Sequence, residues 1–201
     1  MPSHPFVAYE GPIASGKTTH AILLARKIGV IPVLEEFPEN EFLADFYGDQ
    51  TRWALPMQLS FLALRTAQLR KVVHPLNEPV IADYSYLKDP AFAQLLLKER
   101  ELRLYQRISA EFQTTLLKHD LIVYLDARNE VLLERIRQRN RSYEATIDSA
   151  YQDSLRAAYE KAFVANPELK VIRYDTSDVD LDSQKDVDWL QEMILGVLRT
   201  R

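Results

Sequence analysis

The feature that most constrains the fold of this chain is the run Gly11-Pro12-Ile13-Ala14-Ser15-Gly16-Lys17-Thr18. It follows an apolar segment, residues 6–9, precedes a pattern typical of a helix, and fits G-x-x-x-x-G-K-[ST]. Glycines let successive backbone N–H groups turn toward one phosphate, and the N-terminus of the next helix adds partial positive charge. Lys17 can reach the β- and γ-phosphates, and the Thr18 hydroxyl can bind Mg²⁺. A chance match in this strand–loop–helix context is uncommon, so we predict a phosphate-binding loop that also includes Thr19 rather than an ordinary turn.

The composition is typical of one globular domain, residues 1–201, with 47% hydrophobic and 27% charged residues. A formal net charge of −4 gives no indication of nucleic-acid binding. The chain has no cysteine, which excludes disulfides and thiolate chemistry and fits a cytoplasmic protein. No apolar run approaches the roughly 18 residues of a membrane span, and no signal-peptide pattern is seen, so we expect no membrane partner. The four histidines lack ligand spacing and are predicted to be surface or capping residues: His4, His20, His74 and His119.

Strand-like and helix-like segments alternate along the chain. Five apolar, β-like runs lie at residues 6–10, 31–35, 79–83, 121–126 and 170–175. Apolar stripes with helical spacing lie between and after them, at residues 21–28, 59–69, 104–116, 131–136 and 189–197. This alternation predicts an α/β fold with a parallel five-stranded sheet that helices cover on both faces.

Each of the four predicted strands after the first ends in an acid, namely Glu35, Asp83, Asp126 and Asp175. Open α/β sheets bind ligands beyond the carboxyl ends of their strands, where the phosphate-binding loop also lies. We therefore expect Glu35 and Asp83 to be functional, whereas Asp126 and Asp175 are expected to cap the following turn or helix. Glu36 is the neighbouring alternative to Glu35, but its side chain would point to the opposite face of the strand.

A basic cluster runs from Arg135 to Arg141 at the end of a predicted helix. Arg135 and Arg139 share one helical face, and Arg141 follows in the loop. A solvated helix end would also tolerate these charges. Phosphoryl transfer, however, needs donors around the equatorial oxygens, and guanidinium groups suit that task. We predict an arginine-rich lid over residues 135–146.

With these elements in place, the chain resembles the deoxynucleoside kinase family. The resemblance rests on Glu35 with the segment 40–47, on Arg52-Trp53 with Gln58 and Arg65, on Asp83-Tyr84-Ser85 with Asp89, and on residues 135–144. It implies a P-loop NTPase-type fold and transfer of the γ-phosphoryl group of ATP, with Mg²⁺, to the 5′-hydroxyl of a deoxynucleoside in nucleotide salvage. It also implies a homodimer, for which we expect residues 55–70 and 101–117 to form the interface.

The resemblance also assigns residue roles. Glu35 is similar to the carboxylate that contacts the 5′-hydroxyl, and Tyr47 with Glu144 is similar to the pair that holds the 3′-hydroxyl. Gln58, Arg65 and Asp89 would read the base and Phe92 would stack on it. On the triphosphate side the resemblance assigns lid arginines and a residue in the loop beside the adenine of ATP: Arg135, Arg139, Arg141 and Asp180.

One departure concerns Tyr84, which stands where many relatives have an arginine that helps to bind the 5′-hydroxyl and phosphate. A tyrosine here resembles some bacterial deoxypurine kinases and favours a purine substrate, with Tyr84 on the substrate side. Asp83 is expected beside Thr18 on the Mg²⁺ side, although the sequence leaves open whether Asp83 or Glu35 accepts the proton.

Three alternatives remain at this stage. A nucleoside monophosphate kinase of the thymidylate kinase type would need a cation for the acceptor phosphate, which Tyr84 does not supply. A GTPase-type switch would need an Asn-Lys-x-Asp motif, which the sequence lacks. A non-catalytic nucleotide-binding subunit would not need Lys17, Thr18, Glu35 and the lid together.

Overall fold

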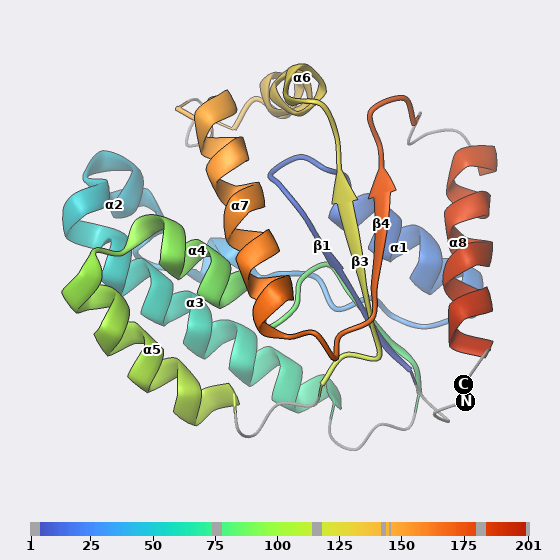
Figure 1. Cartoon of the computed structure of the whole chain (residues 1–201), viewed down its shortest axis with the longest axis horizontal. Helices are drawn as coiled ribbons and strands as arrows, with labels where there is room; N and C mark the ends of the chain where they lie inside the picture. Colours follow the sequence, from blue (N-terminus) through green and yellow to red (C-terminus); the bar gives the residue numbers. More distant parts are fainter. Residues whose placement is uncertain are drawn as a thin grey trace.

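The computed structural model describes residues 5–73, 78–113, 118–141, 144, 146–179 and 184–199. Its centre is a parallel sheet of four strands, β1 (Phe6–Glu10), β2 (Val80–Ala82), β3 (Leu121–Asp126) and β4 (Val171–Asp175), in the order β2-β1-β3-β4. In the register, Val7 of β1 lies opposite Ile81 of β2 and Leu121 of β3. The strands run side by side through the middle of the molecule, so that their carboxyl ends meet at one edge (Figure 1).

The expected fifth strand, residues 31–35, is reduced to a single bridge between Val33 and Ala82. The Val33 N–H donates to the Ile81 carbonyl at 2.8 Å, and Val33 accepts from the N–H of Asp83 at 3.1 Å. The ladder does not continue to Glu35, because the Glu35 N–H donates instead to Asp83 Oδ1 at 2.8 Å. The segment still runs along the outside of β2 and carries Glu35 to the carboxyl edge of the sheet.

Helices cover both faces of the sheet, as predicted. Helices α1 (Lys17–Ile28) and α8 (Gln184–Arg199) pack on one face, against Val7, Tyr9 and Leu125. Helices α3 (Gln50–Val73), α4 (Lys88–Leu96) and α7 (Ser149–Ala165) pack on the other, against Phe6, Ala8 and Tyr124. Successive residues of β1 therefore enter opposite apolar cores, which is the expected pattern for a doubly covered sheet.

The remaining helices lie beside the sheet and beyond its carboxyl edge. Helices α2 (Leu43–Gly48) and α5 (Glu99–Gln113) join α3 and α4 in a third apolar cluster beside the sheet, and a 3₁₀ turn spans Phe37–Glu39. Helix α6 (Asn129–Arg139) lies across the ends of β3 and β4 (Figure 1). Within the described segments, no helix combines the length and the apolar character needed to cross a membrane.

The prediction that the histidines lie at the surface is wrong for His20 and His119, which are 1% and 6% exposed. The His119 ring packs between Phe6 and Tyr86, with ring centroids 4.1 and 4.9 Å away. Aromatic neighbours that are distant in sequence create this pocket, so periodicity could not reveal it. His4 and His74 lie outside the described residues.

Candidate active site

The glycine-containing loop connects β1 to α1 and folds around the Lys17 ammonium group. Lys17 Nζ donates to the carbonyls of Gly11 at 2.9 Å and Pro12 at 2.7 Å. Gly11 has a φ of +143°, and a Cβ there would lie 1.9 Å from the Leu125 carbonyl oxygen, so only glycine fits against β3. Gly16 caps α1 in the left-handed region, with φ +97°. Thr18 and Thr19 follow in the first turn of α1, with Thr18 exposed.

A cavity of about 450 Å³ opens beside this loop at the carboxyl edge of the sheet. Most of the predicted site residues line it, although they come from seven separate parts of the chain: Ile13, Ala14, Lys17, Thr18, Glu35, Tyr47, Gln58, Arg65, Asp83, Phe92, Arg139, Arg141 and Glu144. The volume falls in the range typical of small-molecule sites.

Asp83 connects the loop to the opposite wall of this cavity. Its Oδ2 accepts from the Thr18 hydroxyl at 2.6 Å, and its Oδ1 accepts from the backbone N–H of Glu35 at 2.8 Å. A hydroxyl beside a carboxylate is a hard-oxygen donor set that fits Mg²⁺, which commonly uses one or two carboxylates together with substrate phosphates. Thr18 and Asp83 can therefore hold the ion at the phosphate end.

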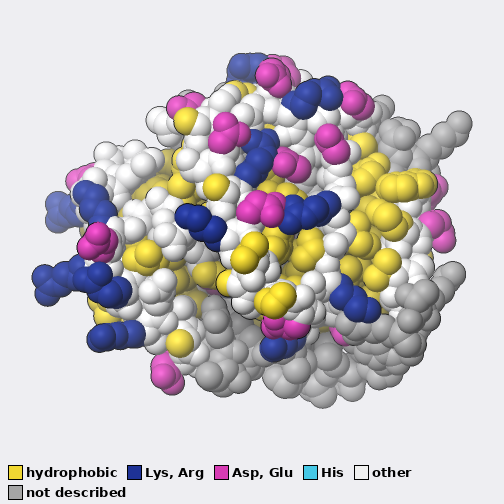
Figure 2. Space-filling model, viewed as in Figure 1, with side chains coloured by type: hydrophobic (Ala, Val, Ile, Leu, Met, Phe, Trp, Pro, Cys, Tyr) yellow, Lys and Arg dark blue, Asp and Glu magenta, His cyan; other side chains and the backbone are white. Residues whose placement is uncertain are grey.

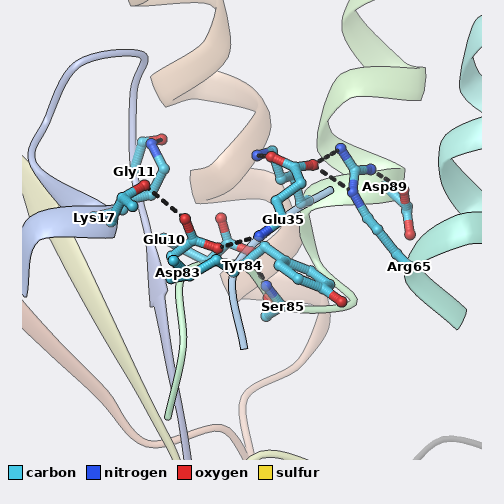
Figure 3. Close-up of polar contacts among 12 residues, drawn as sticks. Glu10, Gly11, Lys17, Glu35, Arg65, Asp83, Tyr84, Ser85 and Asp89 are labelled. Atoms are coloured by element: carbon cyan, nitrogen blue, oxygen red, sulfur yellow. Dashed lines mark hydrogen bonds and ion pairs between the residues drawn. The ribbon is translucent and has the colours of Figure 1, made fainter. Parts of the chain in front are cut away.

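Glu35 lies between two cations. Its Oε1 accepts from Arg65 Nε at 2.7 Å and also from Arg65 Nη2, and its Oε2 accepts from Lys88 Nζ. Burial would raise the pKa of this carboxyl group, but the charges of Arg65 and Lys88 lower it to about 2. Arg65 also contacts Asp89, so it joins two acids from different elements (Figure 3).

Helix α3 brings a buried amide side chain to the wall of the cavity. Gln58 is 1% exposed, and its Oε1 has no hydrogen-bond partner among the described residues. A buried carbonyl without a donor costs free energy, so this atom is a natural contact for a donor on a ligand. Phe92 and Tyr47 line the same cavity, and the guanidinium of Arg65 lies 4.4 Å from the Phe61 ring centroid.

The lid arginines do not all point to the cavity. Arg139 and Arg141 line it and approach Glu144, at 4.0 and 3.3 Å. Arg135 instead binds Thr176, with donors at 3.0 Å from Oγ1 and 2.7 Å from the carbonyl oxygen. Acidic and basic side chains are interspersed over α6 (Figure 2), where Arg137 donates to Glu134 at 3.0 Å. Residues 142, 143 and 145 of the predicted lid and Asp180 lie outside the described residues.

Tyr84 differs from its prediction as a substrate-side residue. It is fully buried, does not line the cavity, and its hydroxyl donates to Gln68 Oε1 at 2.5 Å. Figure 3 shows its ring directed away from Lys17. Because residues 80–82 form a strand and the next side chains alternate, Asp83 takes the cavity side and Tyr84 the core side.

Asp126 and Asp175 accept from the N–H groups of Ala127 and Ser177, which fits their predicted capping role.

Two residues were missed by the sequence analysis. The Gln152 amide binds both backbone groups of Ile13, and Lys88 reaches Glu35 from the first turn of α4. Neither belongs to a motif. For Lys88, a usable signal was its place next to Asp89 at the start of a helix that follows Asp83 by five residues.

Comparisons with known proteins agree with this geometry. The family model described as deoxynucleoside kinase matches residues 7–194. A deoxyguanosine kinase of Bacillus subtilis is 36% identical over 187 residues, covering 90% of both chains. A deoxyadenosine/deoxycytidine kinase of the same organism is 27% identical over 209 residues, covering 98% of this chain and 95% of the relative. The solved structure of a deoxyadenosine kinase from M. mycoides with bound dATP shares the fold, with a TM-score of 0.80 at 22% identity over 95% of this chain and 99% of that one.

Proposed function

This chain belongs to the deoxynucleoside kinase family, and we propose that it phosphorylates the 5′-hydroxyl of a purine deoxynucleoside, deoxyadenosine or deoxyguanosine, for nucleotide salvage. Members of the family are ATP-dependent phosphotransferases. The observation that carries the proposal is one cavity with Lys17 and Thr18 on one wall and the paired carboxylate of Glu35 on the other. A γ-phosphate and an acceptor hydroxyl would meet between these walls.

The phosphate end would act by electrostatics and positioning. The loop amides and Lys17 would hold the triphosphate, and Arg139 and Arg141 would approach the transferring group from the lid. Mg²⁺, when held by Thr18 and Asp83, would neutralise charge on the phosphate oxygens. Closure of the lid would exclude water, which competes as an acceptor.

Glu35 would act on the acceptor. With a pKa of about 2 it is ionised at neutral pH and accepts a hydrogen bond from the 5′-hydroxyl, but it is a weak base. We therefore assign it mainly the orientation of the hydroxyl. Asp83 contacts Thr18 and belongs to the metal side in this proposal.

The other end of the cavity would select the deoxynucleoside. The unsatisfied Gln58 carbonyl would accept from an N–H of the base, beside the Arg65–Asp89 pair, with Phe92 stacked on the ring. Tyr47 and Glu144 would hold the 3′-hydroxyl and leave little space for a 2′-hydroxyl. The purine assignment is supported by the 36% identity to the deoxyguanosine kinase of Bacillus subtilis.

A homodimer through α3 and α5 is also part of the proposal. The two helices pack together at one side of the molecule (Figure 1), and Leu104 of α5 is 48% exposed. Part of the predicted interface, residues 114–117, lies outside the described residues. A cytoplasmic location stays a prediction.

The deciding experiment measures ATP consumption with the four deoxynucleosides and dTMP offered separately, with Lys17→Ala as the inactive reference. Turnover with deoxyadenosine or deoxyguanosine supports the proposal. Turnover with dTMP alone would favour a monophosphate kinase, for which Lys88 offers a cation that Tyr84 does not. No ATP consumption with any of the five acceptors would favour a non-catalytic nucleotide-binding protein.

A further inference from the structure

Lys88 is a cation inside the cavity that no recognised motif accounts for. Its side chain is 12% exposed, it lines the cavity with Lys17 and Thr18, and its Nζ contacts Glu35 Oε2. A lysine so far removed from water needs a compensating anion, and Glu35 is the acid it contacts. The Glu35 carboxylate is thus held at both oxygens, by Arg65 on one and by Lys88 on the other.

The position of Lys88 is fixed by the strand that precedes the phosphate-binding loop. Glu10, the last residue of β1, accepts from the Ser85 N–H at 2.7 Å and the Ser85 hydroxyl at 2.6 Å. Ser85 in turn accepts from the N–H of Leu87 at its hydroxyl and from the N–H of Lys88 at its carbonyl, at 3.0 and 3.2 Å. The turn that begins α4 is therefore tied to the residue directly before Gly11.

Lys88 and Lys17 both line the cavity, so both add positive potential to the space that it encloses. Two like charges that line one cavity repel each other, and an anion between them relieves this repulsion. A transferring phosphoryl group, which carries charge on its equatorial oxygens, is such an anion.

We propose that Lys88 is a positioning residue, which orients the Glu35 carboxylate toward the acceptor hydroxyl. Lys88 also supplies the positive charge that the Asp83-Tyr84-Ser85 turn lacks. Tyr84 cannot do so, because its side chain is buried in the core and donates to Gln68. Lys88 instead reaches Glu35 from the first turn of α4, four residues after Tyr84. This inference rests on the proposed kinase activity.

The test compares Lys88→Met with Lys88→Arg and with Lys98→Met, a control at an exposed lysine that follows the same helix. Steady-state kinetics with ATP and the preferred deoxynucleoside should show kcat about a hundredfold lower in Lys88→Met, with both KM values within about threefold of wild type. Lys88→Arg should recover at least a tenth of wild-type kcat, and Lys98→Met should be unchanged. Thermal unfolding of each variant separates this effect from misfolding, and Lys88→Gln replaces Lys88→Met if the latter does not fold.

Each outcome has one meaning. An active wild type with unchanged kcat in folded Lys88→Met overturns the role of Lys88 and leaves the proposed function standing. A higher KM with unchanged kcat also overturns it, because Lys88 would then contribute only to binding. A wild type inactive with every deoxynucleoside overturns the proposed function, and the inference falls with it.

Discussion

Gln152 satisfies both backbone groups of Ile13 with one side-chain amide. The Ile13 N–H donates to Gln152 Oε1 at 3.1 Å, and Gln152 Nε2 donates to the Ile13 carbonyl at 2.9 Å. Gln152 is fully buried on α7, so the outermost part of the phosphate-binding loop is held by a helix 139 residues further along the chain. The shape of the loop therefore depends on α7 as well as on its own glycines.

Gln152→Leu should loosen the loop. Two partly buried backbone groups would lose their partners, which costs roughly 2–4 kcal/mol of unfolding free energy and should raise KM for ATP. Urea unfolding and steady-state kinetics measure the two effects. Gln94→Leu, at an exposed glutamine of α4, is the matched control. Equal stability of Gln152→Leu and wild type would mean that water replaces the amide.

Asp83 and Glu35 should respond differently to loss of charge. Asp83→Asn should raise the Mg²⁺ concentration for half-maximal activity by about tenfold, because Asp83 contacts the Thr18 hydroxyl. Glu35→Gln should lower kcat by about a hundredfold or more at an unchanged Mg²⁺ requirement. Measuring kcat as a function of Mg²⁺ concentration gives both the Mg²⁺ requirement and the maximal rate of each variant. Glu36→Gln, at the exposed residue next to Glu35, should behave as wild type. The opposite pattern would exchange the two roles.

Gln58→Leu should weaken the purine deoxynucleoside specifically. The variant removes the buried carbonyl oxygen that has no partner among the described residues, and an unpaired donor on the base should raise KM by about 10- to 100-fold. KM for ATP should stay constant, since Gln58 and Lys17 come from α3 and α1, on opposite faces of the sheet. A KM for ATP that rises in parallel would show instead that the whole cavity has changed shape.

The parts of the site that sequence could predict are those fixed by backbone rules. The loop pattern places Lys17 and Thr18, and the carboxyl ends of parallel strands bring Asp83 to them across 65 residues. The expected 31–35 strand reaches the right edge even though it pairs with β2 through one bridge, at Val33. Such features depend on spacing along the chain, which the sequence displays directly.

The parts that escaped prediction depend on side-chain direction. Tyr84 faces the core rather than the cavity because side chains alternate between the two sides after β2. Arg135 does not join Arg139 at the cavity because its guanidinium group binds Thr176 instead. Lys88 and Gln152 act through partners 53 and 139 residues away. No local pattern carries that information, because tertiary packing decides it.

Leu104→Glu should disrupt the proposed dimer. Leu104 is a half-exposed apolar side chain on α5, and a buried, unpaired carboxylate at an interface costs several kcal/mol. Sedimentation velocity at micromolar concentration should give a dimer for wild type and a monomer for the variant. Val164→Glu, at an 80% exposed residue of α7, should remain dimeric. A monomeric wild type would contradict the interface outright.

His119→Phe should flatten the dependence of stability on pH. Burial lowers the pKa of His119 to about 3, whereas the unfolded chain has an ordinary value near 6.5. Between these values the unfolded state binds the extra proton, so the stability from burying a neutral ring is complete above about pH 6.5 and is lost as the pH falls.

The expected change is large enough to measure. Each pH unit below 6.5 costs wild type about 1.4 kcal/mol from this residue, so between pH 7.5 and 5 the variant should gain about 2 kcal/mol relative to wild type. Urea unfolding across this range provides the comparison. Tyr86→Phe changes the neighbouring ring but keeps the imidazole, so it should retain the wild-type pH dependence. Parallel curves for His119→Phe and wild type would mean that His119 takes up its proton in the folded state without leaving its place between Phe6 and Tyr86.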